Sequence, residues 1–374
     1  MLCGVRHDGR WTTTGRLLTV ATTTMLVACL VASCGGGTPT GSVNQANGPV
    51  TLPPGSPTPT STPTPDPGVT IAFAGDIHFT GRTAARLDDP KTALGPIART
   101  LSAADVAVVN LESAITTRGT PEPKSFHFRA PASALDALRD AGVDVTTMAN
   151  NHGVDYGPVG LDDTLEAITA SGFPVVGIGR NSDQAYAPWY TSVRGHRVAV
   201  IGASEIPDRT LTAWTAQPDH PGIASAFSER LVDAVRDART KADVVVVYLH
   251  WGEEGNDCPI SDQTSLAADL AEAGADAVVG THAHLLLGGG WLGQTYVAYG
   301  LGNFLWWRDN AYSNDTGVLT LTFQGRKATA ATLTPARIDG RGVPMPATGS
   351  EAQRITTKWD DARVCTKLSS APPN

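Results

Sequence analysis

The chain has 374 residues, of which 41% are hydrophobic and 17% charged, and its formal net charge is −8. This length and composition exclude a wholly disordered chain and allow one large or two ordinary domains with a substantial core. The acidic excess also excludes a general nucleic-acid binder, which needs a basic surface to neutralise phosphates. We therefore expect a globular protein with no nucleic-acid partner.

Residues 1–33 have the pattern of an export signal. Three arginines precede an apolar stretch over residues 17–33, as in cleaved signal sequences. The stretch ends in small residues before Cys34, which is typical of bacterial lipoproteins that are lipidated on that cysteine. Cys29 also fits, but a glycine run and a polar segment follow Cys34, so we favour Cys34. The alternatives are an ordinary secretory signal and an uncleaved anchor.

Residues 34–68 are rich in Gly, Ser, Thr and Pro and contain few apolar side chains. Such a segment cannot bury enough surface to offset its chain entropy. We expect it to tether a folded domain, residues 69–340, to the outer face of the cell membrane through the lipid. The pattern weakens after residue 340, and we expect residues 341–374 to pack on the domain as a tail.

Two cysteines, Cys258 and Cys365, belong to the predicted domain and its tail. In the oxidising environment that an export signal implies, a disulfide between them would tie the tail to the loop around Cys258. Two separate thiols are the alternative.

From residue 69 onward, short apolar runs alternate with amphipathic stretches. Near-continuous apolar runs predict strands that are buried on both faces, and the amphipathic stretches predict helices. The predicted strands are 70–74, 106–110, 143–148, 175–178, 198–201, 244–249, 277–279 and 295–299, with a hairpin of 317–323 and 328–333. The predicted helices are 132–141, 159–171, 229–241 and 262–273. This alternation predicts an α/β fold.

Side chains that can bind metal ions follow six of the predicted strands. They are Asp76 and His78, Asn110 and Glu112, Asn151 and His152, His250, His282 and His284, and Asn303. The carboxyl ends of parallel strands meet at one edge of a sheet, so we expect these side chains to converge. Five of the nine histidines lie at these ends, which favours one shared site over independent structural roles.

The residue types at this edge suit divalent metal ions. Imidazole, carboxylate and amide groups without thiolate favour Mn, Fe or Zn. Side chains two residues apart in an extended chain point to the same side, so Asp76 and His78, and likewise His282 and His284, should face together. Two such ions can share a carboxylate and activate water for hydrolysis. His152 follows a predicted ligand directly and points elsewhere, which makes it a candidate general acid.

The order of these motifs resembles that of a known family, the CapA-like capsule and poly-γ-glutamate synthesis proteins, a branch of the calcineurin-like metallophosphoesterases. The motifs are Gly-Asp-Ile-His (75–78), Asn-Leu-Glu (110–112), residues 149–157, His-Trp-Gly-Glu-Glu (250–254), Gly-Thr-His-Ala-His (280–284) and Gly-Asn-Phe (302–304). The resemblance covers about residues 70–338. It implies a four-layer α/β/β/α sandwich with a two-metal cleft at the strand ends.

The resemblance also implies roles by position. One ion would be held by Asp76, His78 and His284, the other by Asn151, His250 and His282, and both by a bridging Glu112. His152 matches the family's catalytic histidine. The residues expected to support the ligands or to contact substrate are Asn110, Asp155, Glu253 and Asn303. Two features depart from the usual pattern: Glu112 stands where phosphoesterases usually have Asp, and His78 is often missing in the CapA-like branch.

Two further sets of residues lie near the predicted edge. Residues 124–129 could face an acidic polymer, with a solvated loop as the alternative. Trp251, Trp306 and Trp307 are candidates for the walls of a substrate groove, although core packing is the commoner role of tryptophan.

The resemblance implies a metal-dependent hydrolase that acts on a phosphoester or on an anionic envelope polymer such as poly-γ-glutamate, in capsule biosynthesis. The alternative is a non-catalytic factor that binds the polymer through its metal ions and assists its export, in a complex with the polymer synthase. A third possibility, an interaction module that has lost its metal, is disfavoured because the ligand set is complete.

Overall fold

The computed structural model describes residues 68–373. The predicted export signal, Cys34 and the tether up to residue 67 lie outside the described residues. The first strand begins at Val69, the residue at which we place the start of the folded domain.

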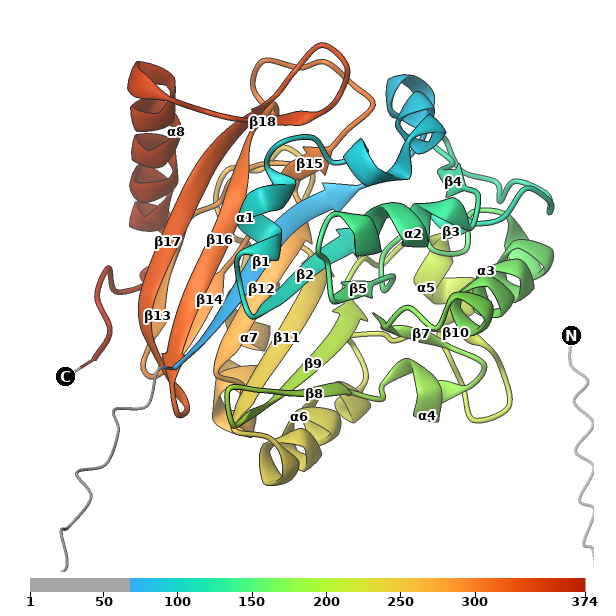
Figure 1. The fold of residues 1–374 in the computed structure, drawn as a ribbon. Coiled ribbons are helices and arrows are strands. Elements are labelled where there is room, and N and C mark those ends of the chain that lie inside the picture. Colours follow the sequence, from blue (N-terminus) through green and yellow to red (C-terminus); the bar gives the residue numbers. More distant parts are fainter. Residues whose placement is uncertain (1–67, 374) are drawn as a thin grey trace, which may run out of the picture. The chain divides into compact units, whose positions relative to one another are not determined.

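Two large sheets form the centre of the domain (Figure 1). The first sheet has the order β18-β17-β16-β1-β2-β5-β6, with β15 pairing to the end of β1. Its strands are β1 (Val69–Ile77), β2 (Val106–Leu111), β5 (Val145–Thr147), β6 (Val175–Val176), β15 (Asn303–Leu305), β16 (Asp315–Gln324), β17 (Lys327–Ile338) and β18 (Pro344–Pro346). The neighbours β1, β2, β5 and β6 are parallel, so their carboxyl ends share one edge.

The second sheet has the order β13-β14-β12-β11-β9-β8. Its strands are β8 (Trp189–Val193), β9 (His196–Ser204), β11 (Val244–Trp251), β12 (Ala277–His282), β13 (Gly289–Leu292) and β14 (Thr295–Ala298). Strands β9, β11, β12 and β14 are parallel, and β8 and β13 join the two edges as antiparallel hairpin strands. Two small pairs complete the strands: β3 (Ala114–Ile115) with β4 (Arg129–Ala130), and β7 (Ile178–Gly179) with β10 (Gly222–Ile223).

The α-helices are α1 (Ala98–Ser102), α2 (Ser133–Asp140), α3 (Gly157–Ser171), α4 (Ser182–Ala185), α5 (Arg209–Trp214), α6 (Glu229–Lys241), α7 (Ser261–Ala273) and α8 (Gly349–Ala362). Four of the α-helices in residues 68–373, α2, α3, α6 and α7, match the predicted helical stretches. Short 3-10 helices are η1 (Gly81–Asp88), η2 (Pro90–Thr92) and η3 (Arg363–Cys365).

The burial pattern divides the domain into four layers. Ile71 and Phe73 of β1 pack with Tyr248 of β11 in a core between the two sheets. Ala72 and Ala74, which alternate with them along β1, pack on the other face with residues of α1, α2 and α3. The outer face of the second sheet packs in the same way with α6 and α7. The predicted four-layer α/β/β/α arrangement is thus confirmed.

The segment after residue 340 contains regular structure that the sequence analysis does not predict. Strand β18 pairs with β17, and α8 lies beside β17 (Figure 1). Ile355 and Trp359 of α8 are buried in the core between the sheets. The tail therefore packs on the domain as an integral helix that closes one side of its central core.

A disulfide joins Cys258 and Cys365, so the expected pairing is confirmed. It links η3, which follows α8, to the loop after β11. Because that loop also contains Glu254 and Gly255 of the site pocket described below, the C-terminal segment is covalently tied to the neighbourhood of the site.

Asp315 is a second anchor of α8. Its carboxylate is 3% exposed and accepts hydrogen bonds from Arg354 at 2.6 and 2.7 Å and from Lys358 at 3.2 Å. Burial opposes its ionisation, but hydrogen bonds from Arg354 and the charge of Lys358 lower the pKa of Asp315 overall. Above about pH 4, the ordinary pKa of Asp, this interaction should contribute its full stabilisation, and the contribution should fall as the pH drops towards the lower folded-state pKa.

We therefore expect Asp315→Asn to lower the free energy of unfolding by about 2 kcal/mol near pH 7, because it leaves charged hydrogen-bond donors without their carboxylate. Urea denaturation measures this change, and the difference from wild type should shrink below about pH 4. Asp233→Asn is the control, since its exposed pair with Arg236 should contribute less than about 1 kcal/mol. An equal effect of both substitutions at pH 7 would contradict the anchoring role.

Candidate metal centre

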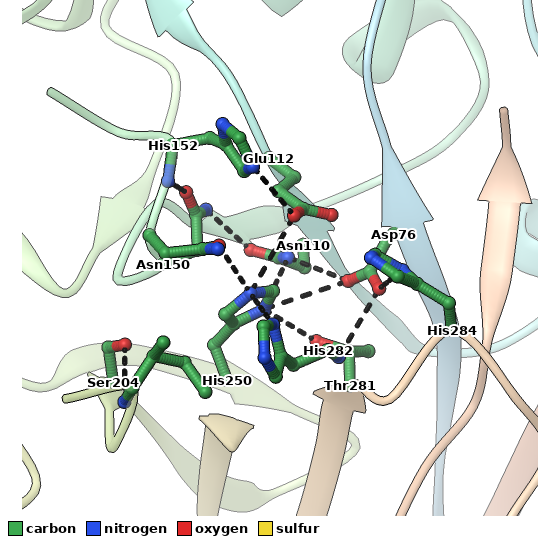
Figure 2. Close-up of polar contacts among 12 residues, drawn as sticks. Asp76, Asn110, Glu112, Asn150, His152, Ser204, His250, Thr281, His282 and His284 are labelled. Atoms are coloured by element: carbon green, nitrogen blue, oxygen red, sulfur yellow. Dashed lines mark hydrogen bonds and ion pairs between the residues drawn. The ribbon is translucent and has the colours of Figure 1, made fainter. Parts of the chain in front are cut away.

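The predicted ligands meet where the carboxyl ends of strands from both sheets face each other. Asp76 lies near the end of β1, Glu112 follows β2, His250 is near the end of β11 and His282 ends β12. Figure 2 shows these four side chains, with His284, pointing toward one another. All of them except His284 are buried, and His284 is largely buried.

The first group of donors is Asp76, Glu112 and His284. One ligand atom from each lies within 4.8 Å of the others, a spacing that could hold a metal ion. Nδ1 of His284 lies 3.3 Å from Oδ2 of Asp76. The other oxygen of Asp76, Oδ1, accepts a hydrogen bond from Asn110 at 2.8 Å, so Asn110 fixes the orientation of this carboxylate.

The second group surrounds Nε2 of His250. This atom lies 2.9 Å from Oδ1 of Asn151, 3.0 Å from Nδ1 of His282 and 3.7 Å from Oε1 of Glu112. Two ligands about 2.1 Å from one ion and at right angles to each other are about 3 Å apart. The spacing of these donors is therefore of the kind found around a bound ion, with Glu112 in both groups.

The protonation of the histidines agrees with ligand roles. Burial, then the neighbouring imidazoles, lower the pKa of His250 and His282 well below the ordinary value, so both rings are neutral near pH 7. Nδ1 of His250 lies 3.2 Å from the hydroxyl oxygen of Thr281, which can accept a hydrogen bond when Nδ1 carries the proton. In that tautomer, Nε2 of His250 presents a lone pair toward the second group of ligand atoms, as binding to a metal ion requires.

The charge of the site calls for a cation. Both oxygens of Glu112 are buried and make no hydrogen bond within the described chain. Burial, then the carboxylate of Asp76, raise the pKa of Glu112 well above its ordinary value. Two buried carboxylates beside neutral imidazoles are costly unless a cation pairs with them. The donor set thus fits a divalent metal ion, which would satisfy the free oxygens of Glu112.

The sequence analysis expects an extended backbone from His282 to His284, but the structure has a turn there. His282 has φ of 91° and His284 has φ of 58°, a left-handed region that residues other than glycine rarely adopt. Strand β12 ends at His282, and the turn, rather than two-residue alternation, brings the two rings to 5.9 Å. Such strain concentrates at functional sites.

His78 does not join the first group as expected. The register of β1 shifts between Asp76 and Ile77, so alternation does not carry the direction of Asp76 to His78. The His78 ring stacks on Phe128 at 4.2 Å, and its Nδ1 accepts a hydrogen bond from the backbone N–H of Thr80. The proton of the neutral ring is then on Nε2, which is buried and has no hydrogen bond to any residue of the described range 68–373. His78 therefore presents an N–H donor beside the centre, and its ligand role rests on the resemblance alone.

His152 is oriented by a carboxylate. Its Nδ1 lies 2.6 Å from Oδ2 of Asp155, and its Nε2 lies 3.8 Å from Oε1 of Glu112. Asp155 accepts a further hydrogen bond from the backbone N–H of Phe128 and is paired with Lys124. Burial lowers the pKa of His152, and Asp155 partly opposes this effect. Asp155 thus sets the tautomer and the direction of the ring.

Asn110 and Asn303, two of the residues predicted to support the ligands, lie at the centre, whereas Glu253 does not. Asn110 donates a hydrogen bond to Asp76, as described, and its Oδ1 accepts a hydrogen bond from the side chain of Asn150. Asn303 is buried beside Asp76 across the β1–β15 pairing, and its Oδ1 has no hydrogen bond within the described residues. Glu253 instead bonds to Asn256 on the surface.

Glu254, the next residue after Glu253, lies near the centre. Oε1 of Glu254 lies 3.9 Å from Nε2 of His284. Because side-chain direction in this loop depends on its turn geometry, sequence order alone does not tell which of the two adjacent glutamates faces inward.

The three tryptophans and the segment 124–129, which the sequence analysis places near a substrate groove, match that expectation only in part. Trp251 is fully buried, packs on Tyr299 and donates to its backbone oxygen at 2.8 Å, so it belongs to the core and not to a groove. Trp306 and Trp307 line a pocket beside the centre, as expected. Lys124 does not face a polymer, because it pairs with buried Asp155.

Asn150, Thr281 and Lys124 are the contributors whose roles sequence reasoning misses. Each lies next to or within a motif that the analysis does identify, and that adjacency is the signal that could have found them. Their contacts, however, join segments far apart in the chain, so their partners become apparent only in the folded structure.

Comparisons with known proteins agree with the motifs. A family model described as "Bacterial capsule synthesis protein PGA_cap" matches residues 70–306. The PGA biosynthesis protein CapA of Bacillus subtilis (strain 168) is 31% identical over 246 residues, 63% of each chain. The capsule biosynthesis protein CapA of Bacillus anthracis is 31% identical over 250 residues, 66% of this chain and 58% of that one. The chain thus spans about three fifths of the length of these relatives.

Solved structures are more distant. A putative 5′-nucleotidase from Staphylococcus aureus is 17% identical, with a TM-score of 0.45 and coverage of 78% of this chain and 58% of that one. A phosphatase from Mycoplasma pneumoniae is 11% identical, with a TM-score of 0.46 and coverage of 74% and 96%. These distant structures carry no information about the site, whose properties follow from its own geometry.

We expect the protein purified with Mn²⁺ to retain at least one equivalent of metal and to melt at a higher temperature than after chelation, because a ligand of the folded state stabilises it. Glu112→Gln should lose most of this metal, since it removes the carboxylate shared by both groups. Elemental analysis and thermal melting measure both effects, with the exposed Glu229→Gln as the control. Equal metal contents in wild type and Glu112→Gln would exclude this site.

Proposed function

The chain belongs to the PGA_cap family of bacterial capsule synthesis proteins, and we propose that it is a metal-dependent hydrolase that acts in the synthesis of an anionic envelope polymer. The observation that carries this proposal is the position of Glu112. Its two buried oxygens make no hydrogen bond within residues 68–373 and lie between two groups of imidazole, amide and carboxylate side chains. This arrangement is suited to hydrolysis and has no evident use in packing.

The proposal assigns two divalent ions, Mn, Fe or Zn. The residues that would hold the first are Asp76, Glu112 and His284, and those that would hold the second are Glu112, Asn151, His250 and His282. When bound, such a pair supplies an activated water near neutral pH and neutralises charge that develops on phosphate or carbonyl oxygens.

The chain's own side chains would position and protonate the substrate. His152, held by Asp155, directs Nε2 toward the centre, where the ring in its protonated form can give a proton to a leaving oxygen or nitrogen. Lys124 pairs with Asp155 and holds this carboxylate in place. Asn110 holds Asp76, and Trp306 and Phe128 exclude water from one side of the pocket.

The substrate class follows from the relatives and remains part of the proposal. The relatives are named for PGA and capsule biosynthesis, which supports an anionic polymer such as poly-γ-glutamate, or a phosphoester intermediate of its synthesis. A polymer synthase complex is the proposed partner. Without residues 1–33 the chain has 25 basic and 35 acidic side chains, so a polyanion would need local positive charge to bind.

A non-catalytic role in polymer binding or export is the second candidate. It is favoured by a relative in Mycobacterium tuberculosis that is named a probable polyglutamine synthesis accessory protein and is 28% identical over 196 residues, 49% of this chain and 50% of that one. In this case the same ions would bind polymer carboxylates without turnover.

We also propose that the protein is a lipoprotein on the outer face of the membrane, anchored at Cys34. The sequence pattern of residues 1–34 supports this anchor. Among residues 68–373, no helix is long and apolar enough to span a bilayer.

We expect Mn-loaded protein to turn over at least one of three substrates: a phosphomonoester, a phosphodiester or poly-γ-glutamate. His152→Gln should reduce kcat at least about 100-fold by removing the proton donor, while its metal content stays at the wild-type level. Absence of turnover on all three substrates, with metal bound, would favour the non-catalytic candidate.

Lipidation has its own test. Cells fed a labelled fatty acid should label the wild type but not Cys34→Ser, because the lipid is attached to that thiol. Cys29→Ser is the matched control and should keep the label. Full labelling of Cys34→Ser would refute anchoring at this position.

A further inference from the structure

A pocket of about 250 Å³ opens beside the metal centre. It is lined by His152, His284 and Asn303 of the centre and by the aromatic residues Phe126, Phe128, Trp306, Trp307 and Tyr312, together with Arg308. One pocket therefore adjoins both the centre and Arg308.

Arg308 presents an uncommitted guanidinium at this pocket. Its Cζ lies 4.5 Å from the ring centroid of Phe126 and 4.6 Å from that of Trp307. Within residues 68–373, the guanidinium makes no hydrogen bond or ion pair, and cation–π contacts hold its plane. Its N–H groups thus remain available to a ligand.

The loop that carries Arg308 is held in place from behind. Arg82 donates to the backbone oxygens of Trp306 at 3.1 Å, of Arg308 at 2.6 Å and of Gly340 at 3.2 Å. Because the loop backbone is fixed and the side chain is stacked, little entropy is lost when the guanidinium binds a partner.

The shape of this group favours a small planar oxyanion. The Phe126 and Trp307 rings are 6.0 Å apart and tilted by 58°, and the guanidinium already lies over both, so they do not offer a parallel slot for a nucleobase. A guanidinium fork matches a carboxylate in a bidentate pair. The apolar rings around it suit the aliphatic stem that carries such a carboxylate.

We propose that Phe126, Trp307 and Arg308 form a carboxylate-binding subsite, which holds a free carboxylate of an acidic polymer while another part of the polymer lies at the metal centre. This inference rests on the proposed function and deepens it, because it locates the residues that would recognise the carboxylates of the polymer. It also supplies the local positive charge that an acidic protein needs to bind a polyanion.

Isothermal titration of the full chain with poly-γ-glutamate, at low ionic strength, tests the subsite. We expect Arg308→Gln to weaken binding about tenfold or more, as for loss of a charge-assisted hydrogen bond, and Arg308→Lys to recover only part of it. Arg180→Gln removes the same charge from an exposed arginine outside the pocket and should change the Kd less than about twofold.

Three outcomes would overturn the proposal. The first is an unchanged Kd for poly-γ-glutamate in Arg308→Gln, and the second is an equal loss of affinity in Arg308→Gln and Arg180→Gln. The third is a loss of affinity in Arg308→Gln for polyphosphate alone, in a parallel titration, which would assign the subsite to phosphate. Titration before and after chelation, with thermal melting of each variant, separates this result from the proposed function. If the protein holds no metal or turns over no substrate, the change in Kd caused by Arg308→Gln can still be measured. If Arg308→Gln leaves the Kd unchanged, metal binding and turnover can still be measured.

Discussion

The burial of two carboxylates close together is the constraint on which the site depends. One carboxylate oxygen each of Asp76 and Glu112 and a ring nitrogen of His284 lie within 4.8 Å of one another. Both carboxylates are buried, and burial lowers the pKa of the neighbouring His250 and His282, so these two rings supply no positive charge near pH 7. A protein gains no stability from such an arrangement without a cation, because desolvation of a carboxylate costs several kcal/mol. Its presence at the convergence of both sheets is therefore best explained by a function.

The scaffold serves this constraint by bringing rigid segments to one edge. Parallel strands in both sheets end at the same place, so ligands from β1 and β2 meet ligands from β11 and β12 without long connections. Secondary contacts then fix each side chain: Asn110 holds Asp76, Thr281 can accept a hydrogen bond from His250, and Asp155 holds His152. Strain at His282 and His284 is tolerated because the surrounding strands determine the position of this turn.

Much of this organisation could be predicted from the sequence. Buried parallel strands have near-continuous apolar runs, and polar motifs mark their ends, so the succession of strands along the chain and most of the convergent residues follow from pattern alone. The layered sandwich of two sheets is implied only by the family resemblance. Short edge strands such as β13 and β15 and the helix α8 could not be predicted, because their burial depends on partners distant in sequence.

The directions in which individual side chains of the site point could not be predicted from the sequence either. Two-residue alternation predicts that His78 accompanies Asp76 and that His282 accompanies His284, but a register shift in β1 and a left-handed turn after β12 break that alternation. Arg308 lies in no recognisable motif, and its role becomes visible only when Phe126, from a segment some 180 residues earlier in the chain, packs against it.

Anomalous diffraction from crystals grown with Mn²⁺ tests the central claim most directly. The account predicts two peaks at the manganese edge, about 3.5–4 Å apart, both bonded to Glu112, one beside Asp76 and His284 and the other beside Asn151, His250 and His282. Diffraction that shows manganese only elsewhere, with Glu112 bonded to protein or water alone, would contradict it.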